Sequence, residues 1–330
     1  MLSFRGRVGR FDHVFRFLVP LIVIHAAVIA IVPPLQFGVV FGSLVLLSLW
    51  PVAVQHRVFT RMGCRGYRAA PGAKKMERSP RDCCALCGNT EFHPKLTISR
   101  KGDDFSIVQC GGCGHVFVAD PPADTANHVE IEKIDWAFRP RHHQIRRLIL
   151  AHLKSGQRVL EIGCGRGEVG YLLRDDPVVY QGYEPARGLS DFGIRAGVPI
   201  VQEIFRGGDM ADAIVIDNVI EHVAEPRQMI EVAARSLRPG GLMIVITPNV
   251  HDVRAVFPQF RKRHLWIPPD HINYFSARDI DFIFTAANLP QPQRFRFFPL
   301  SLKDYRFFPR AFSETLGLSI FGHNVFAIRN

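Results

Sequence analysis

The chain has 330 residues, a hydrophobic fraction of 47% and a formal net charge of +11 at pH 7. This length leaves room for two domains. The charge is uneven, because residues 1–78 carry 11 Lys and Arg against two acids, whereas residues 79–330 carry 30 against 28. Since the basic excess is confined to the N-terminal part, it argues against a nucleic-acid-binding protein, and no nucleic-acid partner is predicted.

Two apolar runs follow each other near the start of the chain. Residues 14–32 have one arginine and one histidine as their strongly polar side chains, and residues 35–54 have no charge. As a helix, each run spans about 30 Å, the thickness of a bilayer core. We therefore predict a transmembrane helical hairpin over residues 1–68, with membrane contact through residues 14–54. A cleaved signal peptide or a buried hairpin of a soluble protein is the alternative.

Arginines flank this hairpin at both ends, whereas the Pro-Pro turn inside it is uncharged. The positive-inside rule then places both ends of the hairpin in the cytoplasm. The flanking segments also resemble the ends of a small bacterial inner-membrane family of unknown function. We therefore expect a bacterial-type inner (plasma) membrane location with the remainder of the chain in the cytoplasm. The flanking arginines are Arg5, Arg7, Arg10, Arg57, Arg61, Arg65 and Arg68.

A linker and a cysteine-rich segment come next. Residues 69–82 combine Pro, Gly and charge with no apolar period, which predicts a flexible tether. Two C-x-x-C-G knuckles then follow, separated by 22 residues, and residues 95–99 and 105–108 between them alternate like a short hairpin. This spacing is typical of a zinc ribbon, so we predict such a module over residues 83–122. The predicted metal ligands are Cys84, Cys87, Cys110 and Cys113.

Four thiolates close a tetrahedral site, so the predicted zinc is structural rather than catalytic. Cys83 and His115 lie beside the knuckles as less favoured substitute ligands. Two disulfides are the alternative to a metal, and a reducing cytoplasm disfavours them.

A connecting helix is predicted over residues 136–153, because Ile145, Ile149 and Leu153 lie on one apolar stripe with helical spacing. His142 and His143 lie on the same segment, where we expect a solvated pair or a pair at the edge of a cleft.

The run VLEIGCGRG at residues 159–167 predicts a buried strand that ends in a glycine turn and opens a helix. Glu161 lies inside the strand, and Glu184 closes the next strand-like run at residues 178–184. Glycines let a backbone approach a ligand closely, and an acid about 20 residues further on can bind both ribose hydroxyls. The layout therefore favours a nucleoside ligand.

The glycine turn is ambiguous by itself. Residues 165–170 also match G-x-G-x-x-G, the dinucleotide motif, which leaves an NAD-dependent enzyme as an alternative. In that motif the helix N-terminus faces a pyrophosphate. The charge of Glu161 would repel a pyrophosphate, but it suits a cationic ligand such as S-adenosylmethionine (SAM), which carries an ammonium and a sulfonium group.

Downstream motifs favour SAM. An apolar strand from residue 212 leads into Glu221-His222-Val223 and Pro226, and a helix, a turn at residues 237–241 and a further strand follow. In this order and spacing the chain resembles the class I SAM-dependent methyltransferases, in the branch with an E-H-V-x-x-P motif that includes ubiquinone-type and glycan O-methyltransferases.

The resemblance covers about residues 128–330, and we expect the methyltransferase domain over residues 123–330. It implies an α/β fold: a Rossmann-like, seven-stranded, mostly parallel sheet with a C-terminal antiparallel hairpin, here joined to a small zinc ribbon and an N-terminal transmembrane hairpin. We expect the hairpin strands at residues 294–298 and 324–329, with an aromatic, basic insertion between them that forms part of the core or a lid.

The resemblance also assigns the cofactor site. It implies that Glu161 and the glycine turn hold the methionine end of SAM, that Glu184 binds the ribose hydroxyls, and that two residues after the next buried strand flank the cofactor. For the acid that contacts adenine, Glu203 is favoured over Asp209. Cys164 belongs to the turn, where its side chain is expected to be a small filler. The predicted cofactor-binding residues are Glu161, Gly163, Cys164, Gly165, Gly167, Glu184, Glu203, Asp217 and Asn218.

Two histidines are candidates for the catalytic base. His222 follows a strand whose carboxyl end faces ligand in an open α/β sheet, and His271 lies in a loop that closes over the acceptor in similar proteins. A hydroxyl acceptor benefits from a base with a pKa near 7, which histidine supplies. Structural roles for either histidine are the alternatives. Glu221 could instead bind a metal, but the acid cluster of metal-dependent enzymes is not evident.

The resulting prediction is a membrane-tethered methyltransferase that moves a methyl group from SAM to a small-molecule or lipid-linked acceptor, with a hydroxyl of a quinone precursor or a sugar as the preferred target. The alternative is a non-catalytic, membrane-anchored zinc-ribbon scaffold with a degenerate cofactor pocket, which the short segment after residue 201 favours slightly.

Overall fold

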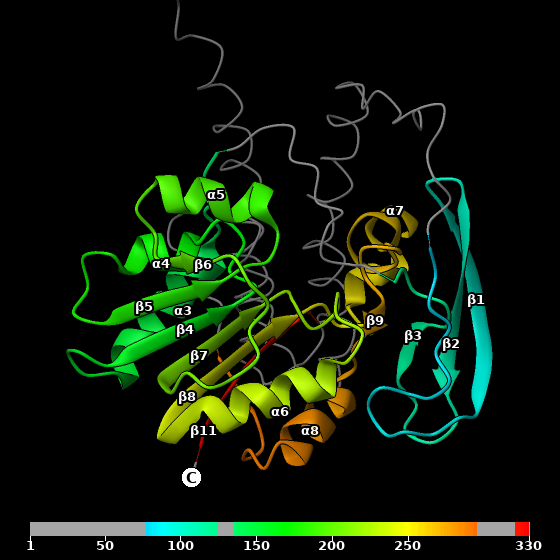
Figure 1. Cartoon of the computed structure of the whole chain (residues 1–330). Helices are drawn as coiled ribbons and strands as arrows, with labels where there is room; N and C mark the ends of the chain where they lie inside the picture. Colours follow the sequence, from blue (N-terminus) through cyan, green and yellow to red (C-terminus); the bar gives the residue numbers. More distant parts are fainter. Residues whose placement is uncertain (1–76, 124–134, 296–320, 330) are drawn as a thin grey trace, which may run out of the picture. The chain divides into compact units, whose positions relative to one another are not determined.

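The computed structural model describes residues 77–123, 135–295 and 321–329 (Figure 1). The predicted membrane hairpin, most of the linker and the aromatic insertion lie outside the described residues. Within the described ranges, no helix is long and apolar enough to cross a membrane. The described residues all fall within one compact unit, which begins at Arg68.

A seven-stranded sheet forms the centre of this unit, in the order β10-β11-β8-β7-β4-β5-β6. Five strands are parallel, whereas β11 runs antiparallel to β8, and β10 antiparallel to β11. The predicted Rossmann-like, mostly parallel sheet with a C-terminal antiparallel hairpin is therefore confirmed. The strands are β4 (Arg158–Ile162), β5 (Val179–Tyr183), β6 (Ile200–Val201), β7 (Ala211–Asp217), β8 (Leu237–Thr247), β10 (Gln293–Arg294) and β11 (His323–Ile328).

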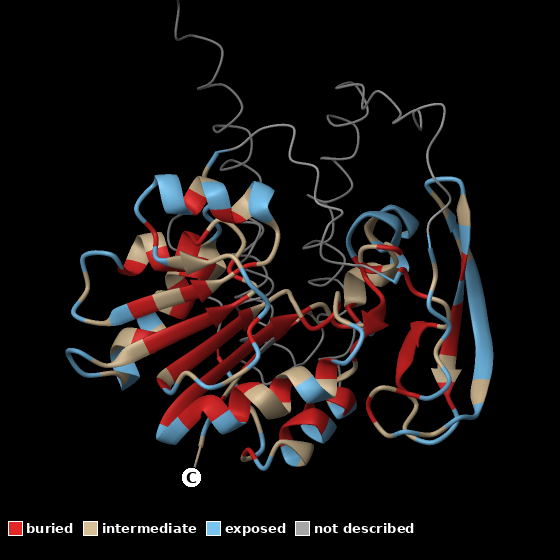
Figure 2. Cartoon of the chain, in the orientation of Figure 1, coloured by how far each residue is buried: buried red, intermediate tan, exposed pale blue. Residues whose placement is uncertain are grey.

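Helices cover both faces of the central sheet, and alternate strand residues point to opposite faces. In β4, Val159 packs in one apolar cluster with α3 and α4, whereas Leu160 packs in the other with α6 and α8. The central strands are therefore buried along their length (Figure 2). The helices are α3 (Pro140–His152), α4 (Glu168–Leu173), α5 (Arg187–Arg195), α6 (Pro226–Ser236) and α8 (Ala277–Ala286).

Two predicted boundaries change in the structure. Helix α3 begins at Pro140 rather than at residue 136, because Pro140 occupies the first turn and forces Arg139 into an extended conformation. The turn expected at residues 237–241 becomes an irregular start of β8, since Leu237 pairs with Ala211 before the ladder shifts register.

A second, four-stranded sheet has the order β1-β2-β3-β9. It contains the hairpin predicted between the knuckles, in longer form, and Lys101 and Gly102 make its turn with left-handed φ angles of 54° and 86°. The strands are β1 (Phe92–Arg100), β2 (Asp103–Cys110), β3 (Val116–Val118) and β9 (Asn273–Tyr274). Strand β9 comes from far along the chain, so a segment near residue 273 completes the sheet of the cysteine-rich segment (Figure 1).

Between β8 and β9 the chain forms three short helical segments. These are η3 (Val253–Val256), α7 (Pro258–Phe260) and η4 (Arg261–Leu265). They lead into the loop that carries His271, and Leu265 at the end of η4 is buried.

Helix α5 packs against the turn after β4 through a glycine. A Cβ added at Gly193 would clash with the backbone carbonyl oxygen of Arg166 and would lie 2.5 Å from Ile200 Cδ1, whereas one added at Gly188 of the same helix would meet nothing within 4 Å. We expect Gly193→Ala to lower the free energy of unfolding by about 1–3 kcal/mol, because backbone cannot move aside cheaply.

Gly188→Ala is the matched control, and we expect it to be neutral or to stabilise by up to about 1 kcal/mol, since alanine favours helix. Urea denaturation of the two variants measures both effects. Equal stability of the two variants would contradict the packing shown between α5 and the turn.

Candidate active site

The glycine turn between β4 and α4 has the geometry that its sequence predicts. Gly163, Gly165 and Gly167 all have left-handed φ angles, of 68°, 59° and 78°. Residues with a side chain rarely adopt this conformation. Gly167 is the N-cap of α4, so the turn ends at the start of a helix and leaves backbone N–H groups at the carboxyl edge of the sheet.

Glu184 connects this turn to the end of the neighbouring strand. Its Oε2 accepts a hydrogen bond from Gly165 N at 2.9 Å, and its Oε1 accepts one from Ala186 N at 2.8 Å. Burial raises the pKa of Glu184, and these two hydrogen bonds oppose the shift. Each carboxylate oxygen can accept a further hydrogen bond, so the side chain can brace the turn and bind a diol at the same time.

The carboxylate of Glu161 is enclosed within the protein. Its side chain is buried, and its Oε2 accepts a hydrogen bond of 2.5 Å from Tyr180 Oη. Burial raises the pKa of Glu161 well above its usual range, and the hydrogen bond from Tyr180 opposes the shift. Cys164 is also buried beneath the turn, where a Cβ on Gly182 would lie 2.6 Å from its sulfur. The sulfur of Cys164 thus fills space beneath the turn, and its role as a filler rather than a nucleophile stays a prediction.

Asp217 ends β7 and is paired with α3. Arg141 Nε donates to both of its carboxylate oxygens, at 2.9 and 2.7 Å, and His142 Nε2 lies 3.5 Å from Oδ2. Burial raises the pKa of Asp217, but Arg141 and His142 outweigh it and hold that pKa below its usual range. His142 is itself buried, so the expectation that it is solvated was wrong, whereas a position at the edge of a cleft stays a prediction. Asn218 follows with a left-handed φ of 54°.

The two acids considered for the adenine contact differ in their exposure and in their partners. Glu203 is exposed two residues after β6, beside the end of β5, so it lies at the carboxyl edge with Glu184. Asp209 precedes β7, where it accepts from Tyr183 Oη, at the end of β5, and pairs with Arg158 Nη1, at the start of β4, at 3.4 Å. Its partners thus come from both ends of the strands, and its role as the second choice for the adenine contact stays a prediction.

His222 and His271 come together at the carboxyl edge, from separate loops. Their ring centroids are 4.9 Å apart, in an edge-to-face arrangement. His222 Nδ1 lies 2.5 Å from the carbonyl oxygen of Asp270, and His271 Nδ1 lies 3.2 Å from that of Leu265. A carbonyl only accepts hydrogen bonds, so each neutral ring carries its proton on Nδ1 and presents an unprotonated Nε2.

The two histidines differ in exposure. The His222 side chain is 36% exposed, whereas burial lowers the pKa of His271 to about 3, with His222 adding to the effect. His271 is therefore neutral throughout the physiological range, and His222 is the histidine of the pair that solvent or an acceptor can reach.

Glu221 lies behind this pair and is fully enclosed. Its Oε2 accepts from Thr247 Oγ1 at 2.9 Å, and its Oε1 lies 3.8 Å from His222 Nε2 and has no hydrogen-bond partner among the described residues. Burial raises the pKa of Glu221. The ligand atoms of Glu221, His222 and His271 lie within 4.8 Å of one another, a spacing that a metal ion could use.

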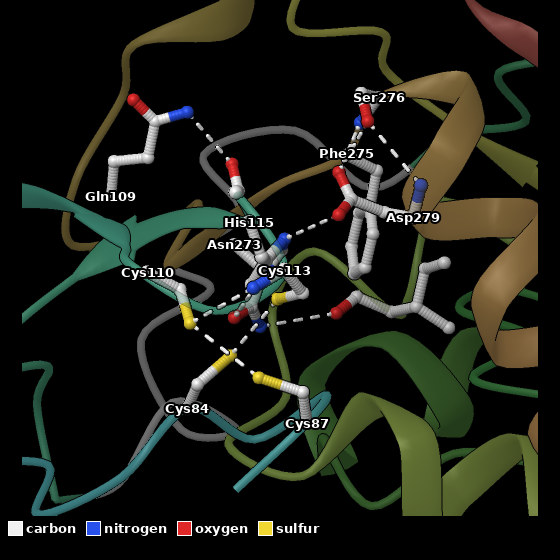
Figure 3. A network of polar contacts seen from close by, with 12 residues as sticks. Cys84, Cys87, Gln109, Cys110, Cys113, His115, Asn273, Phe275, Ser276 and Asp279 are labelled. Atoms are coloured by element: carbon white, nitrogen blue, oxygen red, sulfur yellow. Dashed lines mark hydrogen bonds and ion pairs between the residues drawn. The ribbon is translucent and has the colours of Figure 1, made fainter. Parts of the chain in front are cut away.

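The four knuckle cysteines converge as the sequence predicts (Figure 3). Their sulfurs lie within 4.8 Å of one another, with Cys84 Sγ 3.7 Å from Cys113 Sγ and Cys87 Sγ 3.5 Å from Cys110 Sγ. A tetrahedral zinc with bonds of about 2.3 Å needs sulfur–sulfur separations of about 3.8 Å, so the arrangement fits that ion. All four are free thiols rather than disulfides. The glycine after each knuckle has the left-handed φ expected for the turn, 75° at Gly88 and 82° at Gly114.

Sequence reasoning missed three side chains that set this geometry: Tyr180 on Glu161, Arg141 on Asp217, and Asn273, which bonds the His222 loop. Tyr180 and Glu161 are neighbours only because β4 and β5 pair, and the other two partners lie 76 and 50 residues away in the chain. No local motif marks them.

Known proteins are similar to this chain over the same region. Residues 136–290 match the family model of a methyltransferase domain. A probable SAM-dependent methyltransferase from Mycolicibacterium smegmatis is 35% identical over 158 residues, which are 44% of this chain and 57% of that protein. The ubiquinone biosynthesis O-methyltransferase of Rhizobium etli is 31% identical over 126 residues, 34% of this chain and 51% of that protein. The chain therefore spans little more than half the length of these relatives.

Solved structures with partial similarity include the plantazolicin methyltransferase in complex with S-adenosylhomocysteine. It is 13% identical, with a TM-score of 0.42, and the match covers 57% of this chain and 82% of that one. The magnesium protoporphyrin IX methyltransferase of Synechocystis with bound SAM is also 13% identical, with a TM-score of 0.39 over 58% of this chain and 78% of that one.

Proposed function

We propose that this chain binds SAM in residues 136–290, which match the family model of a methyltransferase domain, and that it transfers the methyl group of SAM to a hydroxyl of a small-molecule or lipid-linked acceptor. The observation that carries the proposal is the left-handed glycine turn bonded to Glu184 at the same sheet edge as His222. Such an edge is where open α/β sheets bind their ligands.

In this proposal the glycine turn and Glu184 hold the nucleoside part of SAM. Glu184 accepts from the ribose hydroxyls while keeping its bonds to Gly165 and Ala186. Glu161 supplies negative charge for the methionine end, because a cation nearby would stabilise its buried carboxylate. Asp217 and Asn218 border the cofactor, and Glu203 is positioned at the edge where the adenine would lie.

SAM supplies a methyl group that is already activated by its sulfonium, so the chain has to align the acceptor and exclude water. The acceptor oxygen forms a bond to the methyl carbon as the carbon–sulfur bond breaks, and S-adenosylhomocysteine leaves with the sulfur electron pair. His222 Nε2 takes the proton of the acceptor hydroxyl. His271, which is neutral, packs against the His222 ring and limits its movement.

The acceptor class comes from the relatives and from the predicted hairpin. Several relatives at about 30% identity are ubiquinone biosynthesis O-methyltransferases, which favours a phenolic hydroxyl of a quinone precursor over a sugar.

A non-catalytic scaffold is the competing proposal. The intact turn, with Glu184 bonded to Gly165, argues against a degenerate cofactor pocket.

We expect full-length protein to bind SAM with micromolar affinity in calorimetric titrations and not to respond to NADH. Glu184→Ala should weaken SAM binding by about 10- to 100-fold, because it removes charged hydrogen bonds worth about 1.5–3 kcal/mol. Asp209→Asn changes a carboxylate that is bonded to Tyr183 and Arg158 rather than to the glycine turn, so it should leave SAM affinity unchanged. A folded protein that does not bind SAM would support the scaffold instead.

We also propose that the four knuckle cysteines hold one structural zinc ion, whose site would be closed by four thiolates. Elemental analysis of the purified protein should find about one zinc per chain. Cys87→Ser should lower this content strongly, because it removes one ligand. Cys83→Ser is the matched control, since Cys83 is exposed and lies outside the cluster, and its zinc content should equal that of the wild type. Equal zinc content in both variants would overturn the assignment.

Residues 1–68 are proposed to tether the enzyme to the inner membrane with the methyltransferase domain in the cytoplasm, because their two apolar runs each match a bilayer core in length. The full chain should then sediment with membranes and resist extraction by high salt, whereas a chain without residues 1–68 should not sediment. Release of the full chain by salt alone would argue for an electrostatic surface contact and against a tether.

A further inference from the structure

The loop that carries His222 is held from outside the central sheet. The backbone oxygen of Glu221 accepts hydrogen bonds from Ile272 N at 2.8 Å and from Asn273 N at 3.1 Å. The Asn273 side chain adds a bond from Nδ2 to the carbonyl oxygen of Val223 at 2.7 Å and a longer one, at 3.4 Å, to that of Ile220. Residues 272–273 thus bond to three of the four residues that surround His222 in the sequence.

These anchoring residues belong to the sheet of the cysteine module, residues 83–122. Asn273 begins β9, which pairs antiparallel with β3, so that Asn273 faces Phe117 and Tyr274 faces Val116. Val118 N donates to Ile272 O at 3.0 Å just beyond the ladder. Contacts with the cysteine module therefore fix the position of the His222 loop, together with β7, from which the loop extends.

The amide of Asn273 has a fixed orientation because of what surrounds its oxygen. Arg81 Nη1 donates to Asn273 Oδ1 at 3.1 Å. His115 Nε2 lies 3.4 Å from the same oxygen, and the two side chains are neighbours in Figure 3. Arginine can only donate, so the oxygen must face the module and the NH₂ group must face the loop carbonyls. Asn273 is buried, so a reversed amide would leave several polar groups without partners.

His115 connects Asn273 to the second knuckle. It follows Cys113 by two residues and is completely buried between the rings of Phe117 and Phe275. Its backbone oxygen accepts from Cys110 N at 2.9 Å, inside the knuckle turn, and its Nδ1 lies 3.5 Å from Asp279 Oδ1 at the start of α8. An unbroken series of contacts thus runs from the knuckle through His115 and Asn273 to the loop of His222.

We propose that Asn273 is a positioning residue through which the cysteine module holds the Glu221–His222 loop in the geometry for methyl transfer. This inference rests on the proposed function for the role of His222. The bonds to the loop hold His222 Nδ1 against the carbonyl oxygen of Asp270, and this contact keeps Nε2 free to accept a proton. A shift of about 1 Å in such a group is enough to lower a rate by about 100-fold.

Asn273→Asp tests the proposal selectively. The new carboxylate keeps its attraction to Arg81 and His115 on the module side, but it replaces the N–H groups that reach Val223 and Ile220 with oxygens that repel those carbonyls. Asn273→Ser is the second variant, because it introduces no charge and simply lacks the reach, so it remains informative if the buried carboxylate impairs folding. Thermal unfolding establishes which variants are folded.

Gln109→Glu is the matched control. Gln109 Nε2 donates to the carbonyl oxygen of Gly114 at 3.0 Å, so this change removes the same kind of amide-to-backbone bond from the module without touching the His222 loop (Figure 3). This variant shows how a general loosening of the cysteine module affects the His222 tautomer. A full-length protein treated with an organomercurial to extract zinc gives the corresponding test of the knuckles themselves.

The first measurement is the tautomer of His222, by nitrogen NMR of histidine-labelled full-length protein, and a His222→Gln variant assigns the signal. The second measurement is the SAM dissociation constant, by calorimetry. We expect the wild type and Gln109→Glu to show the Nδ1–H form alone. Asn273→Asp, Asn273→Ser and zinc-depleted protein should show a mixture in which the Nε2–H form is populated, because the ring is no longer held against a carbonyl oxygen. SAM affinity should change less than about twofold, since Glu184 and the turn are untouched.

Two results would overturn the proposal: an unchanged His222 signal in both Asn273 variants, or an equal change in Gln109→Glu. Failure of the proposed function has a different signature, because a protein that does not bind SAM would still report its His222 tautomer.

Discussion

The backbone of the turn between β4 and α4 is the constraint on which the site depends. A Cβ on Gly163 would lie 2.5 Å from Val219 Cγ2, and one on Gly167 would lie 2.8 Å from Val198 Cγ1. The missing side chains therefore allow two other segments to approach the turn, and one of these, at Val219, leads directly into the His222 loop. The glycines thus determine how close the proposed cofactor site and the proposed base lie to each other.

Three buried acids at the carboxyl edge differ in their partners. Asp217 faces Arg141, whose charge keeps it ionised, whereas Glu161 and Glu221 each accept a hydrogen bond from a hydroxyl and are held against ionisation by burial. A buried carboxylate with no cationic partner is stabilised when a cation arrives. Of these three acids, Asp217 is ionised and paired with a cation, whereas the ionisation of Glu161 and Glu221 would respond to a cationic ligand or to a proton on His222.

The cysteine module and the central sheet with its helices share a core. Cys84, Leu86 and Phe117 pack in one apolar cluster with Phe275 and Ile283, and α6 contacts the first knuckle through Arg227 Nη1, which donates to Leu86 O at 3.1 Å. Segments on both sides of the boundary predicted at residue 122 are thus packed as one body. An ion that orders the knuckles would act on the position of β9 through this packing.

The sequence by itself determined the elements whose signals are local. Apolar strands, left-handed glycines and cysteine knuckles each express the conformational needs of a few adjacent residues, and for this reason the strand at residues 159–162, the turn at residues 163–167 and the cluster of four thiols could be predicted from the residues. The mostly parallel sheet was implied by the resemblance to class I methyltransferases. The sequence predicted the pair of His222 and His271 only in part, since each was identified as a candidate but their contact was not.

Only the tertiary structure decided the partners of the buried polar groups. The partners of Glu161 and Asp217, the burial of His142 and the clamp by Asn273 all depend on strand register and helix packing, which bring together residues 19 to 76 positions apart. A buried polar atom forms a hydrogen bond with a partner that the packing brings close to it, and the spacing of residues along the chain does not predict which partner this is.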